Sequence, residues 1–197
     1  MIRHLDLKHF ILVVQDWGGP IGLNYAVQHR TNLRGIVVMN TWAWPAEILP
    51  MKLFSFAMGG WPIGYWLQTR LNFFDKVIVP HGIYQTDKVT NSLRSAYTDP
   101  FPTPKSRKPT WIFPRQIRKA RTWLADIESK LSNLSDLPAQ ILWGTKDSAG
   151  FPLEQMAKWQ KYLPMNETAI LEDASHYVQE DRPDQVASSI RRILNRT

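Results

Sequence analysis

The sequence predicts an α/β protein built on a parallel sheet. Four short apolar runs are typical of buried strands: residues 10–15, 35–40, 136–144 and 167–172. Strands buried on both faces are nearly continuously apolar, and parallel strands need helical connections between them. Polar residues follow three of the runs, at Asp16, Asp147 and His176. Because parallel strands all end at one edge of the sheet, we expect these three side chains to lie close together.

The first forty residues follow the order helix, strand, helix, strand. We expect residues 2–10 to be the end of an amphipathic helix that leads into the strand 10–15. A second helix is expected at 21–29, and the strand 35–40 follows it. This alternation is typical of a parallel α/β sheet.

Asp16 stands at the turn between the first strand and the second helix. Trp17, Gly18 and Gly19 follow it directly, and the glycines allow the backbone to turn sharply. A tight turn from strand to helix can hold a nucleophile at its apex. An aspartate after a strand can also simply cap the helix, so the local sequence leaves both roles open.

The strand pattern stops after residue 41 and resumes near residue 134. The stretch between is rich in Trp, Phe, Pro and Gly, and helical patterns occur in it at 63–71, 88–97 and 116–126. We therefore expect a helical cap at 46–133, inserted between two core segments, 1–45 and 134–197. In the second core segment, helices are expected at 153–162 and 182–194.

Composition limits the class of protein. The 197 residues are 44% hydrophobic, which suffices for a sizeable core, and they include no cysteine. We therefore expect no disulfide and no thiolate zinc site, and a cytoplasmic location. No apolar run is long enough to span a bilayer, so no membrane partner is expected.

A basic stretch raises the question of nucleic-acid binding. The net charge is +7, and residues 105–121 hold seven cations and no acid, with Trp111 and Phe113 between them. Cations interleaved with aromatic residues can bind single strands. Prolines interrupt the stretch and it carries no nucleic-acid motif, so a solvated basic face is the preferred interpretation and no nucleic-acid partner is expected.

The order of the polar residues favours catalysis. Alone, Asp147 reads as a turn residue and His176 as a solvated loop histidine. An acid, an insertion, a second acid and a histidine at the ends of successive strands instead indicate a triad of nucleophile, acid and base.

These motifs resemble the haloalkane dehalogenases, a family with the α/β-hydrolase fold. The resemblance rests on the segments 13–19 (VVQDWGG), 96–102 (AYTDPFP), 141–147 (ILWGTKD) and 174–183 (ASHYVQEDRP). It covers essentially the whole chain and is closest to the family's third subgroup. It implies that the chain is the C-terminal part of that fold, with parallel strands 5–8 and the cap.

The resemblance implies a reaction without a cofactor or a metal. Asp16 would displace halide from a haloalkane and form an alkyl ester, which water activated by His176 would hydrolyse. Asp147 would orient His176. The indole of Trp17 would bind the halide, and its backbone amide would stabilise the oxyanion. For a second halide donor, the cap residues Trp61 and Trp66 are available, although core packing is the simpler role for them.

Two alternatives stay open. An epoxide hydrolase would share the triad but would need cap tyrosines, for which Tyr65, Tyr84 and Tyr97 are available. A non-catalytic fragment or binding module is the other. The acid does not lie after the second strand, since Asn40 stands there, and the sequence does not indicate an oligomeric state.

The resemblance also implies a truncation at the N-terminus. The family's first four strands have no counterpart, and with them an oxyanion amide and an early asparagine are missing. We expect upstream DNA to encode this region, and we expect the free-standing chain to be weakly active or inactive.

Overall fold

The structure is a computed structural model that describes residues 2, 4–148 and 151–196. Residues 1, 3, 149–150 and 197, short parts of the two expected core segments, lie outside the described residues. The strands are β1 (Phe10–Asp16), β2 (Leu33–Thr41), β3 (Ala139–Gly144) and β4 (Asn166–Leu171). The α-helices are α1 (Gly18–Ala26), α2 (Leu49–Gly59), α3 (Ile63–Leu71), α4 (Val79–His81), α5 (Asn91–Thr98), α6 (Lys108–Lys119), α7 (Arg121–Lys130), α8 (Leu153–Tyr162), α9 (Val178–Asp181) and α10 (Pro183–Arg196). Shorter helical turns are η1 (Arg30–Asn32), η3 (Thr86–Lys88), η4 (Leu131–Leu134) and the π-helix η2 (Phe74–Ile78).

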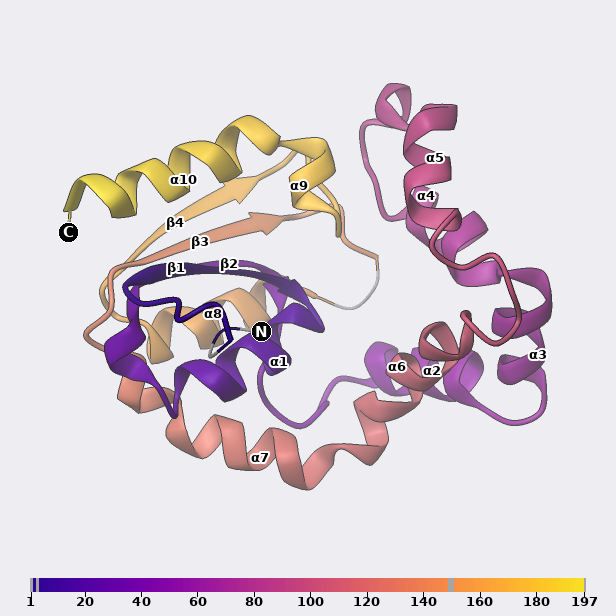
Figure 1. The fold of residues 1–197 in the computed structure, drawn as a ribbon, viewed down its shortest axis with the longest axis horizontal. Coiled ribbons are helices and arrows are strands. Elements are labelled where there is room, and N and C mark those ends of the chain that lie inside the picture. Colours follow the sequence, from indigo (N-terminus) through magenta and orange to yellow (C-terminus); the bar gives the residue numbers. More distant parts are fainter. Residues whose placement is uncertain (1, 3, 149–150, 197) are drawn as a thin grey trace.

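The sheet is parallel, with strand order β1-β2-β3-β4. Helices cover both faces: α1, α7 and α8 lie on one side and α10 on the other (Figure 1). The residues of β2 alternate between the two layers, since Ile36 and Val38 face the first and Val37 and Met39 face the second. This alternation explains why β2 is almost entirely apolar. Within the described part of the chain, β1 pairs with β2 alone, and Val13 is 37% exposed.

The core is rich in tryptophan. Trp42, Trp44, Trp143 and Trp159 are fully buried, and three of their indole N–H groups donate within the molecule. Trp159 donates to the Thr41 carbonyl at 2.8 Å, Trp143 to the Phe151 carbonyl at 3.0 Å, and Trp44 to Gln155 at 2.7 Å. Two of these hydrogen bonds join the end of β2 and the loop after it to α8. The third joins β3 to the segment that leads into α8. The indole nitrogen of Trp42 has no partner among the described residues.

Helices α2 to α6 lie beyond the carboxyl ends of the strands (Figure 1). Of the expected helices, 63–71 and 153–162 match α3 and α8 residue for residue, and the expected strands lie within two or three residues of β1 to β4. The expectation of one helix at 116–126 is wrong. Two helices, α6 and α7, meet there at Ala120. Helix α2 was not expected from the sequence pattern.

Two departures from expectation have clear physical causes. The expected helix at 2–10 is absent from the residues described there: Asp6 and His9 have φ of 45° and 53°, which a right-handed helix excludes. Leu5 and Leu7 are exposed, so no core is available to hold an amphipathic face. The prolines that were expected to interrupt the basic stretch do not end α6. Pro109 lies in the first turn of the helix, where its missing N–H costs nothing, and Pro114 lies inside the helix.

None of the described helices is both long enough and apolar enough to cross a membrane.

A glycine pair at the start of α1 offers a test of the close packing between α1 and β2. A Cβ on Gly19 would lie 1.9 Å from Thr41 Oγ1, whereas a Cβ on Gly18 would have nothing within 4 Å. We expect Gly19→Ala to lower the free energy of unfolding by about 1–3 kcal/mol, because Thr41 would have to give up its hydrogen bond to the Asp16 carbonyl. Urea denaturation measures the effect, with Gly18→Ala as the control. Equal losses in the two variants would contradict the packing explanation.

Candidate active site

Three loops at the carboxyl edge of the sheet carry the expected site residues. Asp16 ends β1, Asp147 follows β3 and His176 follows β4. Asp16 has φ of 45°, in the left-handed region that aspartate tolerates better than most residues. The next helix begins two residues later, at Gly18. The tight turn expected from the sequence is therefore present, and it directs the Asp16 side chain away from the sheet.

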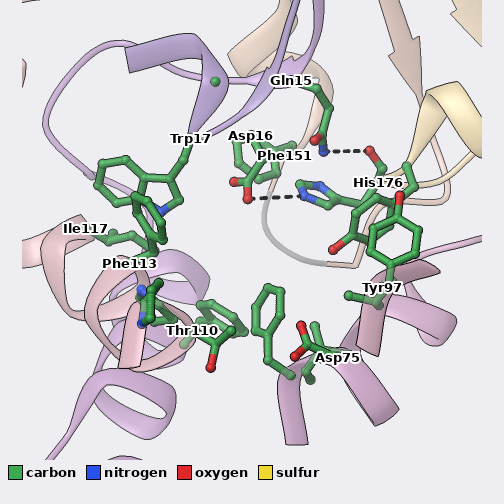
Figure 2. A pocket seen from close by; sticks show the side chains of 18 of the residues that line it. Gln15, Asp16, Trp17, Asp75, Tyr97, Thr110, Phe113, Ile117, Phe151 and His176 are labelled. Carbon is green, nitrogen blue, oxygen red and sulfur yellow. Dashed lines mark hydrogen bonds and ion pairs between the residues drawn. The ribbon is translucent and has the colours of Figure 1, made fainter. Parts of the chain in front are cut away.

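The structure brings these three residues together. His176 Nδ1 lies 2.8 Å from Asp147 Oδ2, and His176 Nε2 lies 3.8 Å from Asp16 Oδ2 (Figure 2 shows Asp16 and His176). The exposed fraction of the side chains is 1% for Asp147, 9% for His176 and 31% for Asp16. The imidazole thus stands between a buried carboxylate and one that is open to the cavity.

The charge on His176 depends on these two carboxylates. Burial alone would lower its pKa, but the Asp147 carboxylate, with Asp16 adding to it, outweighs burial and raises the pKa of His176 to about 10. The position of His176 between these two acidic side chains therefore favours its protonated form.

Asn40, set aside at the sequence level because it is uncharged, positions the acid. Its side-chain amide donates to Asp147 Oδ2 at 2.9 Å and to the Gly144 carbonyl at 3.0 Å, while its Oδ1 accepts from the Gly144 N–H at 2.8 Å. Asn40 is fully buried at the end of β2. One side chain therefore ties the second strand to the loop that carries Asp147.

Further side chains hold the His176 loop, and the sequence pattern did not indicate them. Gln15 Nε2 donates to the His176 carbonyl at 3.0 Å (Figure 2), and the Phe151 ring stacks on the imidazole with ring centres 5.3 Å apart. The buried Asp181 carboxylate accepts from the backbone N–H groups of Ser175, Tyr84 and Gln85 at 2.8–3.1 Å. Asp181 thereby joins the loop after β4 to the segment after α4.

A cavity of about 350 Å³ opens in front of Asp16 and His176. Most of its wall is aromatic or aliphatic: Trp17, Trp42, Met51, Phe54, Phe74, Ile78, Val79, Phe101, Phe113, Ile117 and Phe151 belong to it. Trp17 lies beside Asp16 with its indole nitrogen toward the cavity (Figure 2), and that nitrogen has no acceptor among the described residues. Trp61 and Trp66, the tryptophans available as second halide donors, are exposed and are not part of the wall.

One acid on this wall was not expected from the sequence. Asp75, on the π-helix η2, is only 4% exposed, and Figure 2 shows it across the cavity from Asp16. Burial raises the pKa of Asp75 to about 6, against the opposing effects of the Asn72 side chain and the Arg107 charge. The sequence pattern did not indicate Asp75 as a residue of the cavity wall, because an aspartate inside a helical pattern normally faces solvent.

Within the described ranges, no group of three or more His, Asp or Glu side chains is arranged to hold a metal ion.

The pairing of His176 with Asp147 predicts a dependence of stability on pH. A pKa raised in the folded state contributes stability that is fully present below the unfolded value near 6.5 and is lost as the pH rises through about 10. We expect Asp147→Asn to lower the pKa of His176 and to remove this part of the decline between pH 7 and 10. NMR titration of the imidazole and urea denaturation measure the two effects.

Asp126→Asn is the control. It removes a carboxylate that forms an exposed ion pair with Lys130, and neither residue is next to a triad residue in the sequence. An unchanged His176 titration in Asp147→Asn would contradict the assignment.

Comparison with known proteins agrees with this architecture. A family model described as the alpha/beta hydrolase fold matches residues 1–183. Haloalkane dehalogenase 2 of Mycobacterium tuberculosis (strain H37Rv) is 34% identical over 190 residues, 96% of this chain and 65% of that relative. A cis-3-alkyl-4-alkyloxetan-2-one decarboxylase of Xanthomonas campestris is 30% identical over 203 residues, covering all of this chain and 67% of the relative. The chain thus spans about two thirds of the length of these relatives.

Solved structures share the fold. Haloalkane dehalogenase DbeA from Bradyrhizobium elkani superposes with a TM-score of 0.85 at 23% identity, over 100% of this chain and 72% of that one. A putative ancestral haloalkane dehalogenase superposes with a TM-score of 0.84 at 23% identity, over 98% and 72%. At this identity the likeness concerns the fold alone. With the family model spanning nearly the whole sequence, the parallel sheet and its loops are those of an α/β hydrolase, and the chain belongs to that family.

Proposed function

We propose that this chain carries the catalytic centre of a haloalkane dehalogenase, which converts a haloalkane and water to an alcohol and a halide ion. The observation that carries the proposal is the line of Asp16, His176 and Asp147 at an apolar cavity with the Trp17 indole beside Asp16. A carboxylate is already anionic at neutral pH, so it can attack carbon without a base.

In the first step, an Asp16 carboxylate oxygen attacks the sp³ carbon that bears the halogen. The new carbon–oxygen bond forms an alkyl ester, and the halide leaves with the electron pair of the broken bond. The Trp17 indole is a donor only, so it can stabilise the departing anion without competing as a nucleophile. The apolar wall favours a substrate that is mainly hydrocarbon.

In the second step, His176 removes a proton from water, which attacks the ester carbonyl and releases the alcohol. Formation of the ester removes the negative charge of Asp16, one of the two carboxylates that raise the pKa of His176. Loss of this charge lowers the pKa of His176, so the imidazolium releases its proton to solvent and the neutral imidazole then accepts the proton of the attacking water. The imidazolium returns that proton to the departing alkoxide, and the Asp16 carboxyl group is regenerated. Asp147, held by Asn40, stabilises the imidazolium that results.

We also propose that residues 46–133 act as a cap on this site. The wall residues Met51 and Phe54 belong to α2, Ile78 to the π-helix η2, and Phe113 and Ile117 to α6. These elements lie beyond the carboxyl ends of the strands (Figure 1), where a cap would cover the triad and exclude water.

An epoxide hydrolase is less well supported. That reaction needs tyrosine hydroxyls free to protonate the epoxide oxygen, and of Tyr65, Tyr84 and Tyr97 only Tyr97 belongs to the cavity wall. Its hydroxyl donates to Glu180 Oε1 at 2.8 Å. A cap tyrosine committed in this way is a poor acid for the substrate.

Decarboxylation of a β-lactone is the second candidate function. The relative named for that activity is 30% identical over the whole of this chain, and a carboxylate nucleophile in an apolar cavity suits an alkyl-substituted ring as well. Halide release from 1-bromobutane or 1,2-dibromoethane, carbon dioxide release from a cis-3,4-dialkyloxetan-2-one and diol formation from styrene oxide distinguish the three activities.

Two variants test covalent catalysis. We expect Asp16→Asn to lower the rate of halide release by at least about a thousandfold, because the nucleophile is lost. His176→Gln should still allow the displacement but should block hydrolysis, so the alkyl ester accumulates. Mass spectrometry after exposure to 1-bromobutane should find one added butyl group on the peptide that contains Asp16.

The double variant Asp16→Asn/His176→Gln is the control and should carry no adduct. An unmodified peptide in a folded His176→Gln protein, with cooperative unfolding checked by circular dichroism, would contradict covalent catalysis and would favour a non-catalytic role.

A further inference from the structure

Asp75 is a buried acid that the proposed reaction does not use. It lies on the π-helix η2 and belongs to the wall of the cavity, across from Asp16 (Figure 2). Its Oδ2 is buried and has no hydrogen-bond partner among the described residues. A π-helical turn is rare and is found disproportionately at functional sites.

A comparison with Asp181 indicates that the role of Asp75 is not purely structural. Asp181 is fully buried too, but its carboxylate accepts hydrogen bonds from three backbone N–H groups. A carboxylate that stabilises a fold is saturated in this way, because an unpaired buried oxygen costs free energy. Asp75 leaves part of this cost unrelieved, because the Asn72 side chain hydrogen-bonds to the carboxylate but Oδ2 has no partner among the described residues.

Polar groups from the neighbouring elements do not saturate Asp75. At the start of α6, the Arg107 guanidinium adds a favourable charge but donates its hydrogen bonds to the carbonyls of Phe101, Pro102 and Thr69. On α5, Tyr97 donates to Glu180.

Two further titratable neighbours do not pair with Asp75. Arg94 on α5 lines a small adjoining cavity with Asp75, and no ion pair joins the two among the described residues. In the loop after β4, Tyr177 shares the main cavity wall with Asp75 and forms no hydrogen bond with it in the described part of the chain. Apart from the Asn72 side chain, these neighbouring groups therefore leave Asp75 Oδ2 without a hydrogen-bond donor in the described part of the chain.

We propose that Asp75 is a specificity-determining residue that accepts a hydrogen bond from a hydroxyl group at the far end of the substrate. This inference rests on the proposed function: Asp16 attacks the halogenated carbon while Asp75 binds the other end of the same chain. The preferred substrates would then be haloalkanes that carry a hydroxyl group remote from the halogen.

The chemistry of the wall favours a hydroxyl over other groups. The positive charge of Arg107 near Asp75 disfavours an ammonium group. A plain alkyl end would remove water from the carboxylate and leave it without a partner. Because the pKa of Asp75 is about 6, the carboxylate is ionised at pH 8 and is then an acceptor only.

The test compares 4-, 5- and 6-carbon ω-bromoalkanols with bromoalkanes of the same length at pH 8. For the wild type, Asp75→Leu and Asp75→Asn, kcat/KM is measured from halide release. We expect the ratio of kcat/KM for the hydroxylated substrate to that for the alkyl substrate to fall about tenfold or more in Asp75→Leu. Asp75→Asn, which keeps the shape and can still hydrogen-bond, should give an intermediate ratio.

The matched control is Asp87→Leu, which replaces an exposed acid that is not on the cavity wall. Its ratio should equal that of the wild type. Equal ratios in the wild type and the Asp75 variants at every chain length would overturn the inference, and so would a loss that is the same for both substrate types. If Asp75→Leu does not fold, the ratio in Asp75→Asn decides.

Binding of the product alcohols separates this inference from the proposed function. Calorimetry with hexane-1,6-diol and hexan-1-ol requires no turnover. If no halide is released but the diol binds more tightly than the mono-alcohol to the wild type and not to Asp75→Leu, the hydroxyl site stands without turnover by this chain. If halide is released while the variants show no change in diol preference, the hydroxyl site is wrong and dehalogenation stands.

Discussion

The buried contact between His176 and Asp147 is the interaction on which the site depends. The two side chains come from loops that follow β4 and β3, and Asn40 at the end of β2 adds a hydrogen bond to the same carboxylate. Three neighbouring strands are therefore linked at their carboxyl ends by one buried polar network. In an interior of low dielectric, such a network is strong when every member is paired and costly when one is removed. The sheet therefore sets the distance between the imidazole and Asp16. These two residues lie far apart in the sequence, so no local pattern determines that distance.

The cavity combines this polar network with an apolar wall. A wall of aromatic and aliphatic side chains strengthens the electrostatic attraction between His176 and its carboxylates, because little water is present to screen it. The same wall makes any additional charge expensive, which is why burial raises the pKa of Asp75. Two acids beside one cavity therefore differ: Asp147 is paired with His176, whereas Asp75 Oδ2 has no partner among the described residues.

Much of this arrangement could be predicted from the sequence, and the limits have physical causes. Asp16, Asp147 and His176 each follow an apolar run, so the rule that parallel strands end at one edge was enough to bring them together. Asn40 and Gln15 act through the orientation of a single amide group, and no spacing rule encodes that orientation. Asp75 depends on a π-helical turn whose sequence resembles an ordinary helix. The expectation of a helix at 2–10 was wrong, because periodicity alone does not supply a surface for the helix to pack against.

Asp181 has a mechanical consequence. Its carboxylate accepts hydrogen bonds from the backbone N–H groups of Tyr84 and Gln85, just after α4, and of Ser175, directly before His176. Because Asp181 hydrogen-bonds to both segments, a shift of the segment after α4 would also move the loop that carries His176. The distance between the imidazole and Asp16 therefore depends on a side chain that is not itself on the cavity wall.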